Sequence, residues 1–243
     1  MIKVEALNKS FGNKQVLFDI NVAFSNGTVN FVLGASGCGK SVLMKCMVGL
    51  LKPETGSIYL NDIDFLNISY DQQKEKRKEI GMLFQGGALF DSLTVEDNIA
   101  YPLRMFTDFS KDQIKDRVNF CLSRVNMPNV NKLFPSSLSG GMKKRVGIAR
   151  AIALNPKFLF CDEPNSGLDP VTSRLIDELI KEITIEYNIT TVINSHDIKS
   201  VFDMADHILF INKGAKEFEG NLDDFRAVDS FAIKEFISSS KFN

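Results

Sequence analysis

The chain has 243 residues, of which 44% are hydrophobic and 24% charged, and its formal net charge is −1. This length supports one or two domains with a sizeable core, and the near-neutral charge gives no electrostatic reason to expect a nucleic acid partner. No apolar run reaches the roughly 18 residues of a membrane span. Residues 1–14 lack the apolar core of a signal peptide, so we expect a cytoplasmic protein.

The first third of the chain combines strand signals with a glycine-rich loop. Residues 16–33 are interpreted as two strands around Asn26-Gly27, a dipeptide typical of hairpins. Together with residues 56–65 they predict an antiparallel β layer near the N-terminus. After the loop GASGCGKS, apolar residues at helical spacing predict a helix over residues 41–51.

The remainder of the chain predicts a helical region followed by a strand–helix–strand unit. Residues 94–150 are interpreted as mostly helical. The segments 158–164 (FLFCDEP) and 190–196 (TTVINSH) begin as short, continuous apolar strands, and residues 173–187 between them show helical spacing. Apolar strands alternating with a helix indicate a parallel sheet covered by helices, so the predicted fold class is α/β.

The four cysteines do not predict a metal site or a disulfide framework. They form no CxxC pair and no histidine cluster accompanies them; they are Cys38, Cys46, Cys121 and Cys161. Cys38 lies inside the glycine loop, where we interpret it as a small residue that fits rather than as a redox group.

The glycine loop, residues 34–41, indicates a phosphate site. It fits the pattern G-x-x-x-x-G-K-[ST], with an extra glycine at position 37. Glycines let the backbone curl so that its N–H groups point at phosphate oxygens, and the helix that follows adds its positive dipole end. Lys40 is predicted to reach the β and γ phosphates, and the Ser41 hydroxyl to ligate Mg²⁺. A chance glycine-rich turn is the alternative, which the preceding strand and the following helix disfavour.

Two carboxylates at a strand end indicate hydrolysis. FLFCDEP ends a hydrophobic strand in Asp162-Glu163, and a carboxylate at the carboxyl end of a parallel strand can face a nucleotide bound there. Asp162 suits Mg²⁺, through water, and Glu163 suits activation of the attacking water as a general base. Two solvated loop carboxylates are the alternative.

The sequence LSGGM, residues 138–142, provides a second anion site. Two glycines and a serine hydroxyl open the predicted helix that follows. A single bound nucleotide has little use for two anion-binding helix N-termini from the same chain. The simplest solution is a second copy of the protein, whose LSGGM closes over the ATP of the first.

These motifs, with Gln85 in LFQGG, NSGLD and His196 in NSHD, resemble the ATP-binding cassette (ABC) ATPases over about residues 2–222. The resemblance implies a P-loop NTPase fold with an N-terminal antiparallel β layer and a helical subdomain inserted at about residues 90–150. Residues 223–243 are expected to be a C-terminal extension. The resemblance also implies a head-to-tail dimer with two ATP molecules at the interface.

The resemblance assigns roles residue by residue. Phe11 would stack on adenine, where the family usually has tyrosine or another aromatic residue. Gln85 would sense Mg²⁺ and the water while it contacts a membrane subunit, Asp169 would communicate with the opposite site, and His196 would hold the γ-phosphate. The expected catalytic residues are Glu163, His196 and Gln85, and the expected Mg²⁺ ligands are Ser41, Gln85 and Asp162. The expected nucleotide contacts are Phe11, Gly34, Ser36, Gly37, Cys38, Gly39, Lys40, Ser41, Val42, Ser139, Gly140, Gly141 and Asp169.

A narrower resemblance concerns the cargo. LSGGM departs from the commoner LSGGQ, and residues 83–104 and 141–170 look like the ATPases of Mce-type lipid transporters, including the maintenance-of-lipid-asymmetry (Mla) system. That implies a permease, a substrate-binding protein with an Mce domain, room for a small accessory subunit, and phospholipid moved between bacterial inner and outer membranes. The chain would then sit on the cytoplasmic face of the inner membrane. Asn165 stands where the family loop usually has a bulkier residue.

Two other functions stay open at this point. One is a soluble ABC ATPase that serves an assembly process such as iron–sulfur cluster biogenesis. The other is a module that uses ATP only to dimerise, against which Glu163 and His196 argue. In the C-terminal extension, Phe231, Phe236 and Ile237 are expected on one face of a short helix that docks on a neighbouring subunit, with simple fraying of the terminus as the alternative.

Overall fold

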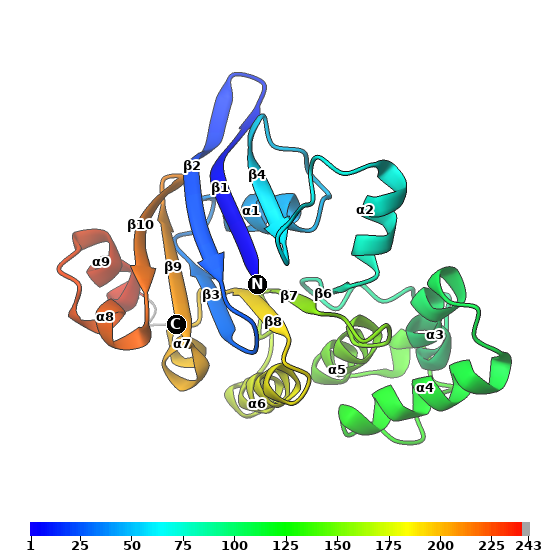
Figure 1. Cartoon of the computed structure of the whole chain (residues 1–243). Coiled ribbons are helices and arrows are strands. Elements are labelled where there is room, and N and C mark those ends of the chain that lie inside the picture. Colours follow the sequence, from blue (N-terminus) through cyan, green and yellow to red (C-terminus); the bar gives the residue numbers. More distant parts are fainter. Residues whose placement is uncertain (240–243) are drawn as a thin grey trace.

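The computed structural model describes residues 1–239 and contains one mixed ten-stranded sheet with the order β5-β4-β1-β2-β10-β9-β3-β8-β7-β6 (Figure 1). The strands are β1 (Ile2–Phe11), β2 (Lys14–Phe24), β3 (Val29–Leu33), β4 (Thr55–Leu60), β5 (Ile63–Asp64), β6 (Ile80–Leu83), β7 (Phe158–Asp162), β8 (Thr190–Asn194), β9 (His207–Asn212) and β10 (Ala215–Gly220). The helices are α1 (Lys40–Met47), α2 (Tyr70–Arg77), α3 (Val95–Phe106), α4 (Lys111–Arg124), α5 (Gly140–Ala151), α6 (Pro170–Glu186), α7 (Ile198–Met204), α8 (Leu222–Ala227) and α9 (Phe231–Ser239), with a 3₁₀ turn at Pro135–Ser137.

The half of the sheet that carries the site is parallel, as predicted. β3 pairs in parallel with β8 and β9, and β7 pairs in parallel with β6 and β8. All five residues of β3 and of β8 are buried, because the parallel sheet is covered on both faces. Phe31 and Leu33 pack into the core shared with α5, α6 and α7, whereas Val32 packs into the core shared with α1 and the N-terminal strands.

The N-terminal strands form the predicted antiparallel layer, but the predicted hairpin is wrong. β1, which the sequence analysis did not identify, pairs antiparallel with both β2 and β4. β2 and β3 are not partners; β3 lies between β8 and β9 instead. The physical reason is that all five residues of β3 are buried, so this strand lies inside the sheet, where other elements cover both of its faces. The turn at Asn26-Gly27 carries the chain from the layer into the core.

A helical subdomain of α3, α4 and α5 lies beside the β6 end of the sheet (Figure 1). Each of the three helices is capped at its N-terminus by a hydroxyl oxygen that accepts a hydrogen bond from a backbone N–H of the first turn. The capping residues are Thr94, Ser110 and Ser139. Pro102 lies inside α3. Within residues 1–239, no helix has both the length and the apolar character needed to cross a membrane.

The C-terminal extension packs on its own chain. The ring centroid of Phe236 lies 5.4 Å from that of Phe210 in β9, and Ile233 is buried beside it. Phe231, in contrast, is 83% exposed. The apolar side chains that we expected to dock together on a neighbouring subunit therefore differ in burial. Phe236 packs against the cassette of its own chain, whereas Phe231 remains exposed. Residues 240–243 of the extension lie outside the described residues.

Candidate nucleotide-binding site

The glycine loop joins β3 to α1 and has a backbone that only glycine tolerates. Gly34 has a φ of 144°, and a Cβ there would lie 2.2 Å from the Ile211 carbonyl oxygen. Gly39, the N-cap of α1, has a φ of 112°. The loop opens onto a cavity of about 800 Å³. Of the expected site residues, those that line this cavity are Gly34, Ser36, Gly37, Gly39, Lys40, Ser41, Val42, Gln85, Glu163 and His196.

Lys40 is the first residue of α1, and its side chain is held by the glycine loop. Its ammonium group donates to the carbonyl oxygens of Gly34 at 2.8 Å and Ala35 at 3.1 Å, and the residue is only 8% exposed. A buried cation at the first residue of a helix that follows a glycine loop is well placed to hold a phosphate. Cys38 is buried in the same loop, and burial raises the pKa of its thiol, which favours the unreactive protonated form.

The ends of β7 and α1 bring together oxygen ligands that fit Mg²⁺. The Ser41 hydroxyl lies 3.3 Å from Asp162 Oδ1, and the same carboxylate oxygen accepts from the amide of Asn194 at 3.0 Å. Gln85, in the loop after β6, lines the same cavity as Ser41. Hydroxyl, carboxylate and amide oxygens are the donors that Mg²⁺ prefers, and the ion would neutralise phosphate charge. The residues present therefore fit this ion.

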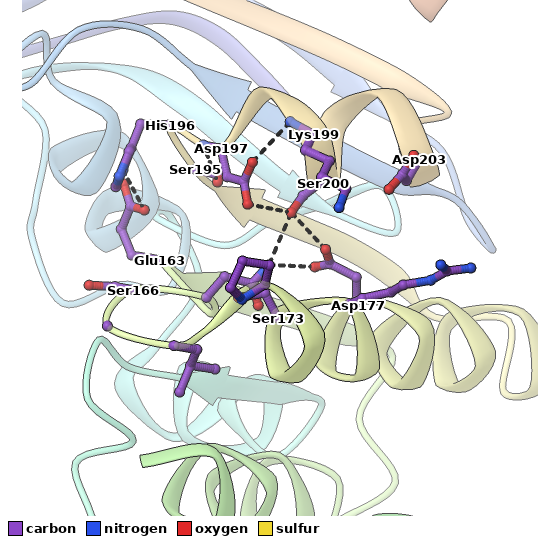
Figure 2. Close-up of a pocket in the computed structure, with 15 residues that line it drawn as sticks. Glu163, Ser166, Ser173, Asp177, Ser195, His196, Asp197, Lys199, Ser200 and Asp203 are labelled. Carbon is purple, nitrogen blue, oxygen red and sulfur yellow. Dashed lines mark hydrogen bonds and ion pairs between the residues drawn. The ribbon is translucent and has the colours of Figure 1, made fainter. Parts of the chain in front are cut away.

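Glu163 and His196 contact each other at the wall of the cavity. His196 Nδ1 lies 2.8 Å from Glu163 Oε2 (Figure 2). The Glu163 side chain is 16% exposed and that of His196 is 64% exposed. Because each residue also lines the phosphate cavity, a carboxylate able to accept a proton from water lies beside an imidazole able to donate to a phosphate oxygen.

The backbone of Glu163 is held in an unusual conformation. Its φ is 50°, which is uncommon for a residue with a side chain. Its N–H donates to the Asn194 carbonyl at 3.0 Å, and its carbonyl accepts from Lys144 Nζ at 3.0 Å. Lys144, on α5, is 3% exposed, and burial lowers its pKa. The sequence analysis missed Lys144 because a lysine early in a helix normally indicates a solvated face.

Besides Cys38 and Asp162, five expected residues do not line this cavity: Phe11, Ser139, Gly140, Gly141 and Asp169. Phe11 is 48% exposed, and Lys9 Nζ lies over its ring at 5.1 Å from the ring centroid. Ser139 caps α5, beside a separate hollow that Gly141 and Thr172 also line. Asp169 caps α6, and the Thr172 hydroxyl that donates to it lowers the pKa of its carboxyl. One chain therefore does not bring LSGGM to its own phosphate loop, as a composite site between two copies requires.

A buried polar cluster lies next to Glu163 and His196 (Figure 2). The Asn165 amide donates to Asp177 Oδ1 at 2.8 Å and to the Ser200 hydroxyl at 3.0 Å. Ser200 Oγ also lies 2.6 Å from Asp177 Oδ2 and 3.1 Å from Asp197 Oδ2. Burial, reinforced by the charges of Asp197 and Asp203, raises the pKa of Asp177 to about 6, from 3.8.

The Asp177 pKa predicts a pH-dependent stability. The folded pKa lies above the unfolded one, so protonation favours the folded chain, and this contribution is lost as pH rises through about 6. The loss amounts to about 3 kcal/mol between roughly pH 4 and 7. Asp177→Asn removes the titrating group, so relative to this variant the wild type should lose unfolding free energy over that range. Urea unfolding of both proteins at several pH values measures it, and two parallel pH profiles would contradict it.

The fold and the site define the class of the protein: a P-loop ATPase with a glycine loop, strand-end carboxylates and a separate signature helix. The family model described as ABC transporter matches residues 17–166, and the chain belongs to this family. It is 37% identical to the "Probable ribonucleotide transport ATP-binding protein mkl" of Mycobacterium tuberculosis, over 99% of this chain and 67% of the relative. It is also 37% identical to the "Methionine import ATP-binding protein MetN" of Campylobacter jejuni, over 100% and 77%.

Solved structures agree with this fold. The dimeric post-hydrolysis state of the cassette MJ0796, bound to ADP and Pi, has a TM-score of 0.83 and 30% identity, covering 91% of this chain and 99% of that one. CbiO1 of Clostridium perfringens, part of the transporter complex CbiONQ, has a TM-score of 0.85 and 31% identity, covering 100% and 94%. The chain is an ABC ATPase that binds and hydrolyses ATP to drive a transporter.

Proposed function

We propose that this ATPase powers a transporter that moves phospholipid between bacterial inner and outer membranes. The observation that carries the proposal is the signature LSGGM at residues 138–142, with residues 83–104 and 141–170, which resemble the ATPases of Mce-type transporters. On this proposal the chain works with a permease, an Mce-domain protein and a small accessory subunit on the cytoplasmic face of the inner membrane. Two chains bind two Mg-ATP between them, and no nucleic acid takes part.

A groove beside the helical subdomain suits a membrane subunit. It is lined by Phe84, Phe90 and Tyr101, each of which is more than a third exposed, together with Met82 and Pro102. Exposed aromatic side chains around a hollow are a frequent feature of protein interfaces. The groove lies between β6 and α3, so the loop that carries Gln85 runs directly beside it.

The loop that carries Gln85 is tied to the signature helix. Arg150, in the last turn of α5, donates to the carbonyl oxygens of Gly87 at 2.8 Å and Ala88 at 2.9 Å. Gln85 itself lines the phosphate cavity. A movement at the groove can therefore reach the nucleotide through this loop. We infer that Gln85 couples ATP hydrolysis to movement of the membrane subunit.

Gln85→Ala is expected to leave ATP affinity within a few-fold and to lower phospholipid transport by at least about 5-fold, the lower end of a typical coupling free energy. ATP binding depends mainly on the glycine loop and Lys40, which this change leaves in place. Transport of labelled phospholipid by complex reconstituted in vesicles measures the effect. Gln73→Ala, on the surface helix α2, serves as the control. Unaffected transport would show that Gln85 does not couple the two processes.

Purification of the complex from membranes tests the cargo. An affinity tag on this chain, mild detergent, and mass spectrometry of both proteins and extracted small molecules should yield a permease, an Mce-domain subunit and phospholipid. Recovery of a permease with a bound ribonucleotide or amino acid would overturn the lipid proposal. Recovery of the chain without any integral membrane protein would point instead to an assembly ATPase.

A further inference from the structure

The catalytic pair Glu163 and His196 lies on two loops that leave the sheet separately. Glu163 follows β7 and His196 follows β8, and the last ladder pair between these strands is Asp162 with Asn194. Beyond that pair the Glu163 N–H still donates to the Asn194 carbonyl at 3.0 Å, but within residues 1–239 the β7–β8 ladder goes no further. The relative position of the Glu163 and His196 side chains therefore also depends on the side chains behind the two loops.

Those side chains are Asn165, Asp177 and Ser200, which we call the clasp. Asn165 lies two residues after Glu163, and Ser200 lies four residues after His196, in α7. Asp177, on α6, accepts from Asn165 through Oδ1 and contacts Ser200 through Oδ2 (Figure 2). The clasp thus joins the loop after β7 to the helix after β8, with one carboxylate of α6 between them.

The chemistry of the clasp requires these residue types. Asn165 uses its amide nitrogen toward both Asp177 Oδ1 and Ser200 Oγ, so it needs two N–H groups on a short side chain. Asp177 and Ser200 are 8% and 4% exposed, and hydrogen bonds in such a poorly hydrated place are stronger and costlier to break. A bulkier apolar residue at position 165 could not make either bond.

We propose that Asn165, Asp177 and Ser200 are positioning residues that hold Glu163 opposite His196 for the chemical step of ATP hydrolysis. They line a hollow that Glu163 and His196 also line, whereas the glycine loop and Lys40 line the adjoining phosphate cavity. The clasp therefore acts on turnover and leaves ATP binding to the phosphate loop. The inference concerns the ATPase site and does not depend on which cargo the transporter moves.

A reciprocal exchange tests the clasp. Asn165→Asp replaces an amide–carboxylate hydrogen bond of 2.8 Å with two carboxylates, which should push the two loops apart when turnover is measured at a pH high enough to ionise both. The double variant Asn165→Asp/Asp177→Asn restores one amide and one carboxylate with donor and acceptor exchanged. Displacement of catalytic groups by about 1 Å can lower rate by about 10²-fold.

We expect Asn165→Asp to lower kcat for phosphate release by the purified complex about 10- to 100-fold, with Kd for Mg-ATP changed less than about 3-fold. The double variant should recover most of the lost kcat. Ser173→Ala, in the same hollow but outside the clasp, is the control and should retain kcat. Unchanged kcat in Asn165→Asp, or a double variant as slow as the single one, would overturn the proposal. If Asn165→Asp does not fold, the double variant and Ser200→Ala provide the test. Wild-type kcat in Ser200→Ala would overturn the proposal, and so would a double variant that folds but turns over slowly.

Discussion

Glu163→Gln is expected to lower the ATP turnover of the complex by about 10²–10⁴-fold, the usual contribution of a general base, while ATP still binds. The amide keeps the size of the side chain but cannot accept a proton from water. The backbone contacts of Glu163 with Asn194 and Lys144 remain, so the loop keeps its conformation. The phosphate contacts of the glycine loop and Lys40 are also untouched.

Phosphate release and calorimetric ATP binding, measured on the same preparation, separate turnover from affinity. Glu178→Gln is a matched control, because Glu178 lies on the exposed side of α6 and pairs with its neighbour Arg174 at 2.9 Å. It should leave turnover unchanged. Wild-type turnover in Glu163→Gln would mean that another residue is the base.

Lys40→Ala is expected to act on binding instead, weakening ATP affinity by about 10- to 100-fold, the value of one or two charge-assisted hydrogen bonds. Lys40 lines the phosphate cavity, where its ammonium group donates to the carbonyls of Gly34 and Ala35. Phosphate oxygens are better acceptors for this cation than neutral carbonyls.

Calorimetry with Mg-ATP measures this loss, and thermal unfolding of each variant establishes that the chain is folded. Lys45→Ala removes an exposed lysine from the same helix, α1, and should bind ATP as the wild type does. An unchanged affinity in Lys40→Ala would remove this lysine from the phosphate site.

Many of the residues that line the candidate site could be predicted from the sequence. The glycine loop and the pair Asp162-Glu163 are short motifs whose residue types are dictated by phosphate and water, and each follows an apolar run that predicts a buried strand. The same apolar runs at residues 158–164 and 190–196 predicted the parallel core, which the structure confirms.

Pairings between distant segments were not predictable in the same way. Asn26-Gly27 favoured a hairpin, yet the burial of β3 placed that strand between β8 and β9. Lys144 contacts Glu163 across 19 residues, and Asn165 contacts Ser200 across 35. A lone lysine, asparagine or serine has no pattern that predicts its partner, so the groups that contact the loops of Glu163 and His196 emerge only from the fold.

The ATP-dependent association of two chains tests the composite site most directly. Glu163→Gln should bind Mg-ATP without turning it over, so the phosphate loop of each copy stays closed against the LSGGM of the other. Light scattering during size exclusion should then show twice the 27.2 kDa mass of one chain with Mg-ATP, and one chain without it. The variant Glu163→Gln/Lys40→Ala should remain a single chain in both conditions. A single-chain mass for Glu163→Gln with saturating Mg-ATP, or a dimer that forms equally without nucleotide, would contradict a site shared between two copies.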